Sequence, residues 1–310
     1  MPDWLVERGI GETRCASVED GEIVEARILL DGLARSGDVL AARLKSSNPA
    51  VAIADGQEYL LPKGAPGVTE GAMITIEVVR ERIPGTEPWK RPLARIAGES
   101  SIVPSTGGQT LPFPSPDDPL GKAGWNDLVD EARSGIVRFA GGELRISPTP
   151  AMTMVDVDGH LPAGDLAIAG AAAAAKAIRR LDIGGSIGID LPTTSGKTAR
   201  QAAAKAIDAH LPQPFERTAV NGFGFVQIVR PRRRASLVEL GQDRASFEAR
   251  ALLRRVAFEP PGAKSLVAHP AVIDAIRPEW IDALAKQIGG AISLRPDGKT
   301  PMSGGHAVNV

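Results

Sequence analysis

The sequence predicts a mixed α+β or α/β protein that carries a small all-β domain near its N-terminus. In the first third of the chain, short alternating runs are separated by Gly, Pro, Asn and Asp, as between strands. From residue 136 onward, apolar strands alternate with helical patterns, which is typical of an α/β core. Residues 98–124 are rich in Pro and Gly and are predicted to link the two parts.

Composition narrows the class of protein further. The 310 residues are 43% hydrophobic and 24% charged, which are ordinary values for a folded chain of about two domains. No apolar run approaches the roughly 18 residues of a membrane span, so no membrane partner is expected. The first eight residues include acidic ones and no long apolar run, so a signal peptide is not expected. The single cysteine, Cys15, permits no internal disulfide and fits a reducing cytoplasm.

The charge balance is almost neutral. The chain has 36 basic and 37 acidic residues, so nothing in its net charge of -1 attracts a polyanion. A nucleic acid would have to be held by a local basic patch. Aromatic residues make up only 4% of the chain, which leaves few side chains to stack on bases.

The N-terminal strands are predicted from alternation and from turn residues. Asp20-Gly21 separates two alternating runs and predicts a hairpin within residues 1–35, which we expect to belong to the later core. Closely spaced strands over residues 36–97 predict a small barrel of OB type. The predicted strands are Val39–Leu44, Ala50–Ala54, Glu58–Leu61, Met73–Arg80 and Leu93–Ile96.

The remainder is predicted as an α/β core over residues 125–240 and a smaller α/β subdomain over residues 241–310. A short helix, Trp125–Ser134, is expected to open the core. The strands expected in the core are Ile136–Phe139, Glu143–Ser147, Ala151–Val157, Ser186–Ile189 and Gly222–Val229, and its longer helices are Leu166–Leu181 and Gly196–His210. The tail Thr300–Val310 is polar and Gly-rich.

Three acidic residues follow apolar strands of this core. Asp156 and Asp158 are two positions apart, so in a strand both carboxylates point to one face. Asp190 ends the next apolar strand, and the intervening helix predicts that the two strands are parallel and adjacent. Three carboxylates at one sheet edge would suit a hard cation such as Mg²⁺ or Mn²⁺. The alternative is that Asp is simply common where a strand meets a loop.

An arginine run follows the last strand of the core. Four guanidinium groups within five positions either grip phosphates or form a solvated basic turn. The run consists of Arg230, Arg232, Arg233 and Arg234.

Lys197 begins a predicted helix, where backbone N–H groups and the helix dipole favour anions. The segment Thr194–Thr198 looks like the end of a phosphate-binding loop. That motif requires glycine where Leu191 stands, so we reject a nucleotide-binding loop.

Several of these segments resemble the ribonuclease E/G family. Residues 148–159 look like its first metal-site strand, and residues 178–190 like its helix, Leu-Asp-apolar-Gly-Gly turn and second metal-site strand. Phe223-Gly224-Phe225, with Arg230 and Arg232, is similar to the strand that follows. The hairpin and barrel have the family's order, and residues 245–308 resemble its DNase-I-like subdomain.

The resemblance implies a ribonuclease-H-like core with an inserted OB-type barrel and a terminal DNase-I-like subdomain. It also implies an endoribonuclease that cleaves single-stranded RNA with a water activated by Mg²⁺ or Mn²⁺, leaving a 5′-phosphate and a 3′-hydroxyl. Asp156 and Asp190 would be the catalytic metal ligands, and Asp158 would ligate or orient the metal. The implied RNA-binding residues are Arg230, Arg232, Arg233, Lys197 and, as the nearest aromatic in the barrel, Tyr59.

The chain also departs from the family's pattern. No 5′-sensor region follows the barrel, and Ser236–Arg244 lacks the cysteines of the family's zinc-link. We therefore expect no zinc, and a homo-oligomer, if formed, would not be zinc-linked. Asp158 stands where the family has Asn, and Gln227 where it often has Glu. Two other functions stay open: a degenerate, non-catalytic RNA-binding or assembly protein of the same fold, and an unrelated α/β metal phosphoesterase.

Overall fold

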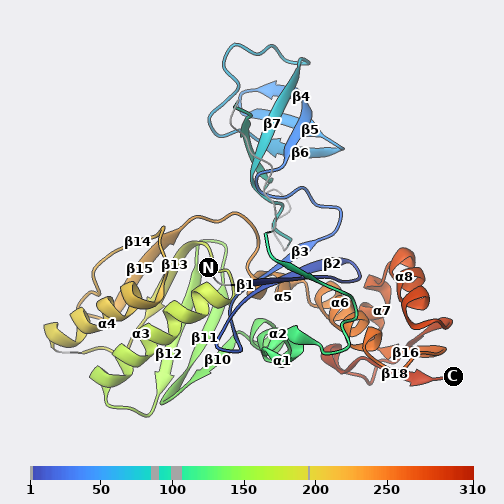
Figure 1. The fold of residues 1–310 in the computed structure, drawn as a ribbon. Coiled ribbons are helices and arrows are strands. Elements are labelled where there is room, and N and C mark those ends of the chain that lie inside the picture. The colour runs from blue at the N-terminus through green and yellow to red at the C-terminus, as the bar shows by residue number, and fades with distance from the viewer. Residues whose placement is uncertain (1–2, 85–90, 99–106, 195) are drawn as a thin grey trace. The chain divides into compact units, whose positions relative to one another are not determined.

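The structure is a computed structural model that describes residues 3–84, 91–98, 107–194 and 196–310. Within these residues the fold is mixed α+β and contains a closed five-stranded barrel besides open sheets (Figure 1). The chain divides into two compact units. The first unit combines residues 1–31, 108–133 and 240–310, and the second combines residues 32–107 and 134–239.

The first unit opens with an antiparallel meander to which a later strand is added in parallel, in the order β3-β2-β1-β9. The elements are β1 (Asp3–Arg8), β2 (Glu12–Glu19), β3 (Glu22–Leu30), β9 (Gln109–Leu111), α1 (Pro119–Lys122) and α2 (Trp125–Ser134). From sequence we expected the hairpin to belong to the 125–240 core. It forms a separate sheet with β9, and it shares its unit with residues 125–133 of that predicted core. β9 and α1 lie in the predicted linker; its residues 99–106 fall outside the described residues.

The C-terminal part of the first unit is an α/β subdomain with sheet order β17-β16-β18. Its elements are α5 (Leu237–Gln242), whose first three residues belong to the second unit, α6 (Arg244–Ala257), β16 (Lys264–Ala268), α7 (Pro270–Ala275), α8 (Pro278–Ile288), β17 (Ile292–Pro296), η1 (Met302–Gly304) and β18 (His306–Asn309). The polar tail supplies β18, which pairs antiparallel with β16. Strand pairing satisfies the backbone N–H and C=O groups of this segment. The hydrophobic pattern of the sequence alone does not show that the pairing occurs.

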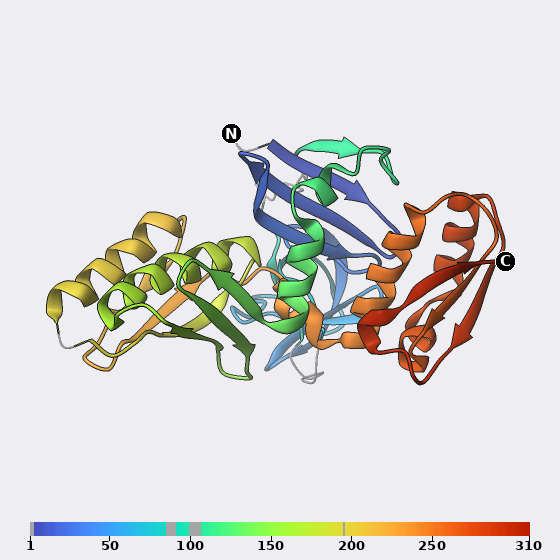
Figure 2. The same ribbon diagram turned by 90° about the horizontal axis from the view of Figure 1, so that it is seen from below.

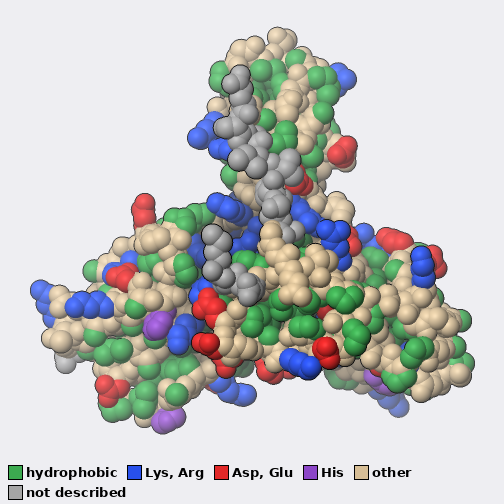
Figure 3. Space-filling model, viewed as in Figure 1, with side chains coloured by type: hydrophobic (Ala, Val, Ile, Leu, Met, Phe, Trp, Pro, Cys, Tyr) green, Lys and Arg blue, Asp and Glu red, His purple; other side chains and the backbone are tan. Residues whose placement is uncertain are grey.

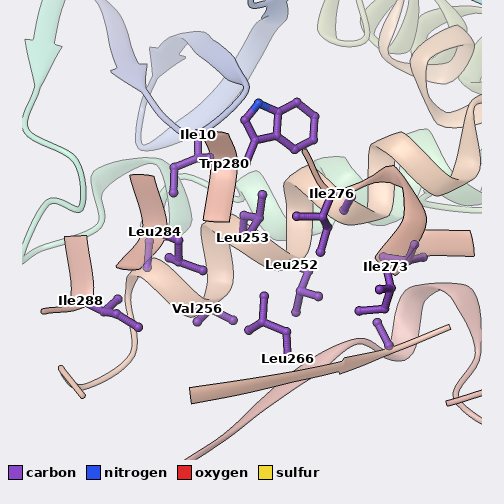
Figure 4. Packing of buried hydrophobic residues seen from close by; sticks show 14 residues of the cluster. Ile10, Leu252, Leu253, Val256, Leu266, Ile273, Ile276, Trp280, Leu284 and Ile288 are labelled. Atoms are coloured by element: carbon purple, nitrogen blue, oxygen red, sulfur yellow. The ribbon is translucent and has the colours of Figure 1, made fainter. Parts of the chain in front are cut away.

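An apolar cluster built around α6 forms the core of this α/β subdomain. Figure 4 shows Leu252 and Val256 of α6 near Leu266 of β16, with Leu284 of α8 in the same cluster. Trp280 packs over Gly11, where an added Cβ would lie 2.6 Å from the indole ring. Because Gly11 also has φ +76°, a side chain there would be both crowded and strained.

Buried ion pairs join the meander to α6 within the same unit. Arg254 Nε donates to Glu7 at 2.9 Å, and Arg250 Nε donates to Glu12 at 2.7 Å. Arg14 Nη1 also donates to Glu7, at 2.8 Å. Since these side chains are almost fully buried, removing one partner would leave an uncompensated charge.

The second unit contains the barrel, with strands in the closed order β4-β5-β6-β8-β7. They are β4 (Val39–Ser47), β5 (Ala50–Ala54), β6 (Gln57–Leu60), β7 (Met73–Arg80) and β8 (Leu93–Ile96). Closure over these short strands confirms the small barrel predicted from sequence. Its interior is lined largely by small residues such as Ala42, Ala52 and Ala94, while Met73 stays exposed. At the top of Figure 3, hydrophobic and basic side chains are mixed on the visible barrel surface.

The rest of the second unit is a six-stranded sheet in the order β10-β11-β12-β13-β15-β14. Its elements are β10 (Ile136–Phe139), β11 (Gly142–Pro148), β12 (Thr153–Gly159), α3 (Ala163–Arg180), β13 (Gly185–Asp190), α4 (Lys197–His210), β14 (Glu216–Arg217) and β15 (Phe225–Arg230). β12 and β13 are parallel, as predicted, and the other described pairs of this sheet are antiparallel. Figures 1 and 2 show α3 and α4 side by side over one face.

No helix of the described residues is both long and apolar enough to cross a membrane.

Candidate functional site

An acid edge, defined as Asp156, Asp158 and Asp190, lies where β12 and β13 end. In the parallel pairing of these strands, Asp156 is the register partner of Asp190. Val157 packs toward α3, since a Cβ added at Gly170 would lie 2.3 Å from its Cγ1. Residues that flank Val157 in a strand point to the opposite face. The carboxylates therefore share the face of the sheet that α3 does not cover.

The acid edge carries three carboxylates, and the nearby cation Arg145 acts on Asp156 only through space, lowering its pKa slightly against the other causes. Within the described residues, none of its three members forms an ion pair. Arg145 lies opposite Asp156 on β11, but its guanidinium pairs with Glu143 at 2.6 Å. Partial burial, and then the neighbouring carboxylates of Asp158 and Asp190, raise the pKa of Asp156. Burial is the larger of these causes, and the like charges of the two neighbouring carboxylates add to it.

The donors of the acid edge fit a divalent cation only in part. Among the described residues, no group of three or more His, Cys, Asp or Glu side chains is already arranged to hold a metal ion. Mg²⁺, however, usually takes one or two carboxylates and completes its shell with water and substrate phosphate. Asp156 and Asp190, as register partners, would supply two such carboxylates, and Asp158 a third from the same face.

Two loops lie beside the acid edge. The segment after Asp190 leads into α4, whose first residue, Lys197, is exposed. On the neighbouring strand, Phe225 is the register partner of Asp190 and follows the turn Asn221–Gly224. The two loops are joined by Thr193 Oγ1, which donates to the carbonyl oxygen of Phe223 at 2.9 Å. Lys197 thus begins a helix, as the sequence predicted, and this helix follows the strand that ends in Asp190.

The arginine run lies at the opposite end of the sheet. Arg230 is the register partner of Gly185, the first residue of β13, whereas Asp190 is the last. At about 3.3 Å per residue, the two ends are separated by roughly 17 Å. Arg230 Nη1 donates to the carbonyl oxygen of Ile183 at 3.2 Å, beyond the C-terminus of α3. The expectation that Arg230 positions RNA at the aspartates is therefore not supported.

The other arginines of the run are also mostly occupied. Arg232 forms an ion pair with Glu239. Arg234, with its side chain 15% exposed, pairs with Asp182 at 2.9 Å and with Glu81 at 3.4 Å. Arg233 is exposed and remains open to a ligand. The sequence shows the charges of such a run but not their partners, which come from α5, the α3–β13 turn and the segment after β7.

Tyr59 is a predicted RNA-binding residue that lies away from solvent in the structure. It is 4% exposed and belongs to the interior of the barrel. A ring enclosed on both faces has none left for a base, so a stacking role is not supported. The other residues of β6 are all half-buried, so no alternation marks the side of Tyr59. Strand alternation alone also does not tell which of the two faces is the interior.

In the sequence, Phe223 stands out only as part of the motif Phe223-Gly224-Phe225. In the structure its side chain is 81% exposed, beside the acid edge. The available signal was an aromatic residue in the turn Asn-Gly-Phe-Gly, outside any alternating pattern.

Comparison with known proteins adds no relative to this picture. No family model matches the chain, and no curated protein matches it significantly.

Proposed function

We propose that the chain is an endoribonuclease of ribonuclease E/G type that cleaves single-stranded RNA in the presence of Mg²⁺ or Mn²⁺. The observation that carries the proposal is the register pairing of Asp156 with Asp190 at the ends of two parallel strands. Carboxylates at the carboxyl ends of neighbouring strands are where α/β sheets commonly bind ligands. The barrel supports the substrate class by fold analogy, since small barrels of this kind often bind single strands.

Asp156 and Asp190 would hold the cation, and Asp158 would hold it directly or through water. A bound divalent cation lowers the pKa of its water and neutralises charge that develops on the phosphate. In the hydrolysis itself, the water oxygen bonds to phosphorus and the bond from phosphorus to O3′ breaks. The O3′ atom takes up a proton, which leaves a 3′-hydroxyl and a 5′-phosphate.

The site offers few other groups for chemistry. Lys197 is exposed at the start of α4, where its ammonium group would attract the backbone phosphates. Arg233 is the member of the arginine run left exposed, and it would make a distant phosphate contact. We propose no zinc, and a reducing cytoplasm suits the lone, buried Cys15.

The second candidate function is a non-catalytic RNA-binding or assembly protein of the same fold. The absence of a ready three-ligand metal group in the described residues favours it. So does the internal pairing of Arg232 and Arg234, which leaves less positive charge for a substrate at that end.

A cleavage assay on the full chain separates the two functions. A labelled, unstructured RNA is incubated with the protein in Mg²⁺, in Mn²⁺ and in EDTA, beside the same RNA annealed into a duplex. We expect cuts in the single strand with either metal and none with EDTA. The products should be substrates for a ligase that requires a 5′-phosphate, which contaminating ribonucleases that leave cyclic phosphates would not produce. Binding without cutting at micromolar protein would favour the second function.

A further inference from the structure

Phe223 presents an aromatic ring to solvent at the edge of the six-stranded sheet. Its side chain is 81% exposed, and among the large hydrophobic side chains of the described residues only the C-terminal Val310 is more exposed, at 86%. Phe225, two positions later, is half-buried, and its ring lies against Gly188 on β13. Because contact of an apolar ring with water is unfavourable, a ligand that covers the Phe223 ring would gain free energy.

The turn that carries Phe223 is held by specific hydrogen bonds. Asn221 Oδ1 accepts from the backbone N–H groups of Phe223 and Phe225, at 2.9 and 3.0 Å. Gly224 has φ +95°, and a Cβ there would lie 2.1 Å from the carbonyl oxygen of Leu191. Thr193 Oγ1 also donates to the carbonyl oxygen of Phe223. The backbone of Phe223 is therefore held at both its N–H and its carbonyl group. The exposed ring is therefore carried by a turn whose conformation these hydrogen bonds fix.

The surroundings of the ring indicate the chemistry of the ligand. Phe225 is the register partner of Asp190, so Phe223 begins only two residues from the acid edge, or about 7 Å along the chain. Lys197 is exposed at the start of the neighbouring helix α4. A ligand that meets all three features has a flat apolar part next to an anionic part that tolerates a cation between itself and the carboxylates. A nucleotide with an unpaired base has this form.

We propose that Phe223 stacks on an unpaired base of an RNA strand whose phosphate lies at the acid edge. The inference rests on the proposed function and deepens it, because a duplex keeps its bases stacked on one another. Phe223 would thereby favour single-stranded over double-stranded substrates and set the position of one base relative to the aspartates. Base stacking on an aromatic side chain changes affinity by about 5- to 150-fold per base.

The test measures stacking without cleavage. Short RNAs that contain 2-aminopurine at single positions are titrated with the full chain in EDTA, and both affinity and fluorescence quenching are recorded. We expect Phe223→Ala to weaken single-strand binding about 5- to 150-fold and to abolish quenching at one position. Phe223→Trp should restore both. Val229→Ala, which changes a 52% exposed side chain near the opposite end of β15, should leave binding unchanged.

The outcomes distinguish this inference from the proposed function. If Phe223→Ala binds and quenches like the wild type, the stacking role is wrong, whether or not the protein cuts RNA. If the wild type quenches through Phe223 but never cuts, the stacking role stands and the nuclease proposal fails. If Phe223→Ala changes only self-association in ultracentrifugation, the ring is a protein contact and the stacking role is overturned. Equal losses on single-stranded and duplex RNA would also overturn it.

Discussion

The two ends of the six-stranded sheet treat their charged residues in opposite ways. At the Gly185 end of β13, Arg230 donates to a backbone carbonyl, while Arg232 and Arg234 pair with carboxylates of the same unit. At the Asp190 end, three aspartates lie together without an ion pair in the described residues, and partial burial together with the two neighbouring carboxylates raises the pKa of Asp156.

The difference indicates which charged residues stabilise the fold and which are available to a ligand. A guanidinium whose donors are used inside the protein stabilises that arrangement and has little left for a ligand. Carboxylates that gather without compensation cost stability, so they are expected where an external cation or substrate completes them. Charge counts in the sequence do not separate these cases, whereas the partners of each side chain do.

The largest effect is expected at the Asp190 end. Asp190→Asn and Asp156→Asn keep the shape of the side chain and remove its charge, so each should lower Mg²⁺-dependent cleavage by at least about 100-fold. Asp158→Asn should be milder, because the resembling family has Asn at that position. Gel cleavage at saturating RNA, beside a melting curve for each variant, measures this.

Asp282→Asn serves as the matched control, because it removes an exposed aspartate from α8 in the other unit. It should cut at the wild-type rate. Persistent cleavage by Asp190→Asn would place the active site elsewhere. The acid edge would then have no catalytic role.

The next effect is on stability, at the Gly185 end. Arg234→Ala leaves the buried Glu81 and the partly buried Asp182 without their shared cation. Breaking such a pair should lower the free energy of unfolding by about 3 kcal/mol. Urea denaturation followed by circular dichroism measures the loss, and the exposed Arg233→Ala should change it by less than about 0.5 kcal/mol. Equal stability of the two variants would contradict a structural role for Arg234.

The pH dependence of that variant sharpens the same point. Burial raises the pKa of Glu81, outweighing Arg234, which acts to lower it. Without Arg234 the pKa of Glu81 should rise further. Because a carboxyl with a raised pKa binds its proton more tightly in the folded state, stability increases as pH falls through that pKa. The stability deficit of Arg234→Ala should therefore shrink between pH 7.5 and pH 5. A deficit that stays constant over this range would mean that Glu81 is not the group left unpaired.

The smallest effect concerns the salt dependence of RNA binding. Each phosphate contact contributes about -0.7 to the slope of log affinity against log salt for a single strand. We expect Arg233→Ala or Lys197→Ala to flatten the slope by at most about 0.7. Arg230→Ala and Arg232→Ala should leave it unchanged, since their guanidinium groups are engaged inside the unit. A flatter slope for the latter pair would return them to the RNA interface.

Local sequence determined most of the elements of this protein. Alternation and turn residues predicted all five barrel strands, and the helix Trp125–Ser134 has its predicted bounds. The parallel pairing of β12 with β13, and with it the meeting of Asp156 and Asp190, follows from a strand, a helix and a strand in succession. Such features depend on neighbours in the chain, so their pattern can be seen in the sequence.

Tertiary structure alone decided which distant segments meet. The hairpin takes β9 as its neighbour instead of a strand of the later core, and the polar tail supplies β18. Tyr59 on β6 faces the barrel interior, while Phe223, in the turn before β15, faces solvent. The arginine run was assigned to RNA because its charges are visible in the sequence, but Glu81 and Asp182, which pair with Arg234, are far from it there. Pairing of strands and compensation of charges depend on contacts between residues far apart in the chain, and those contacts exist only once the chain has folded.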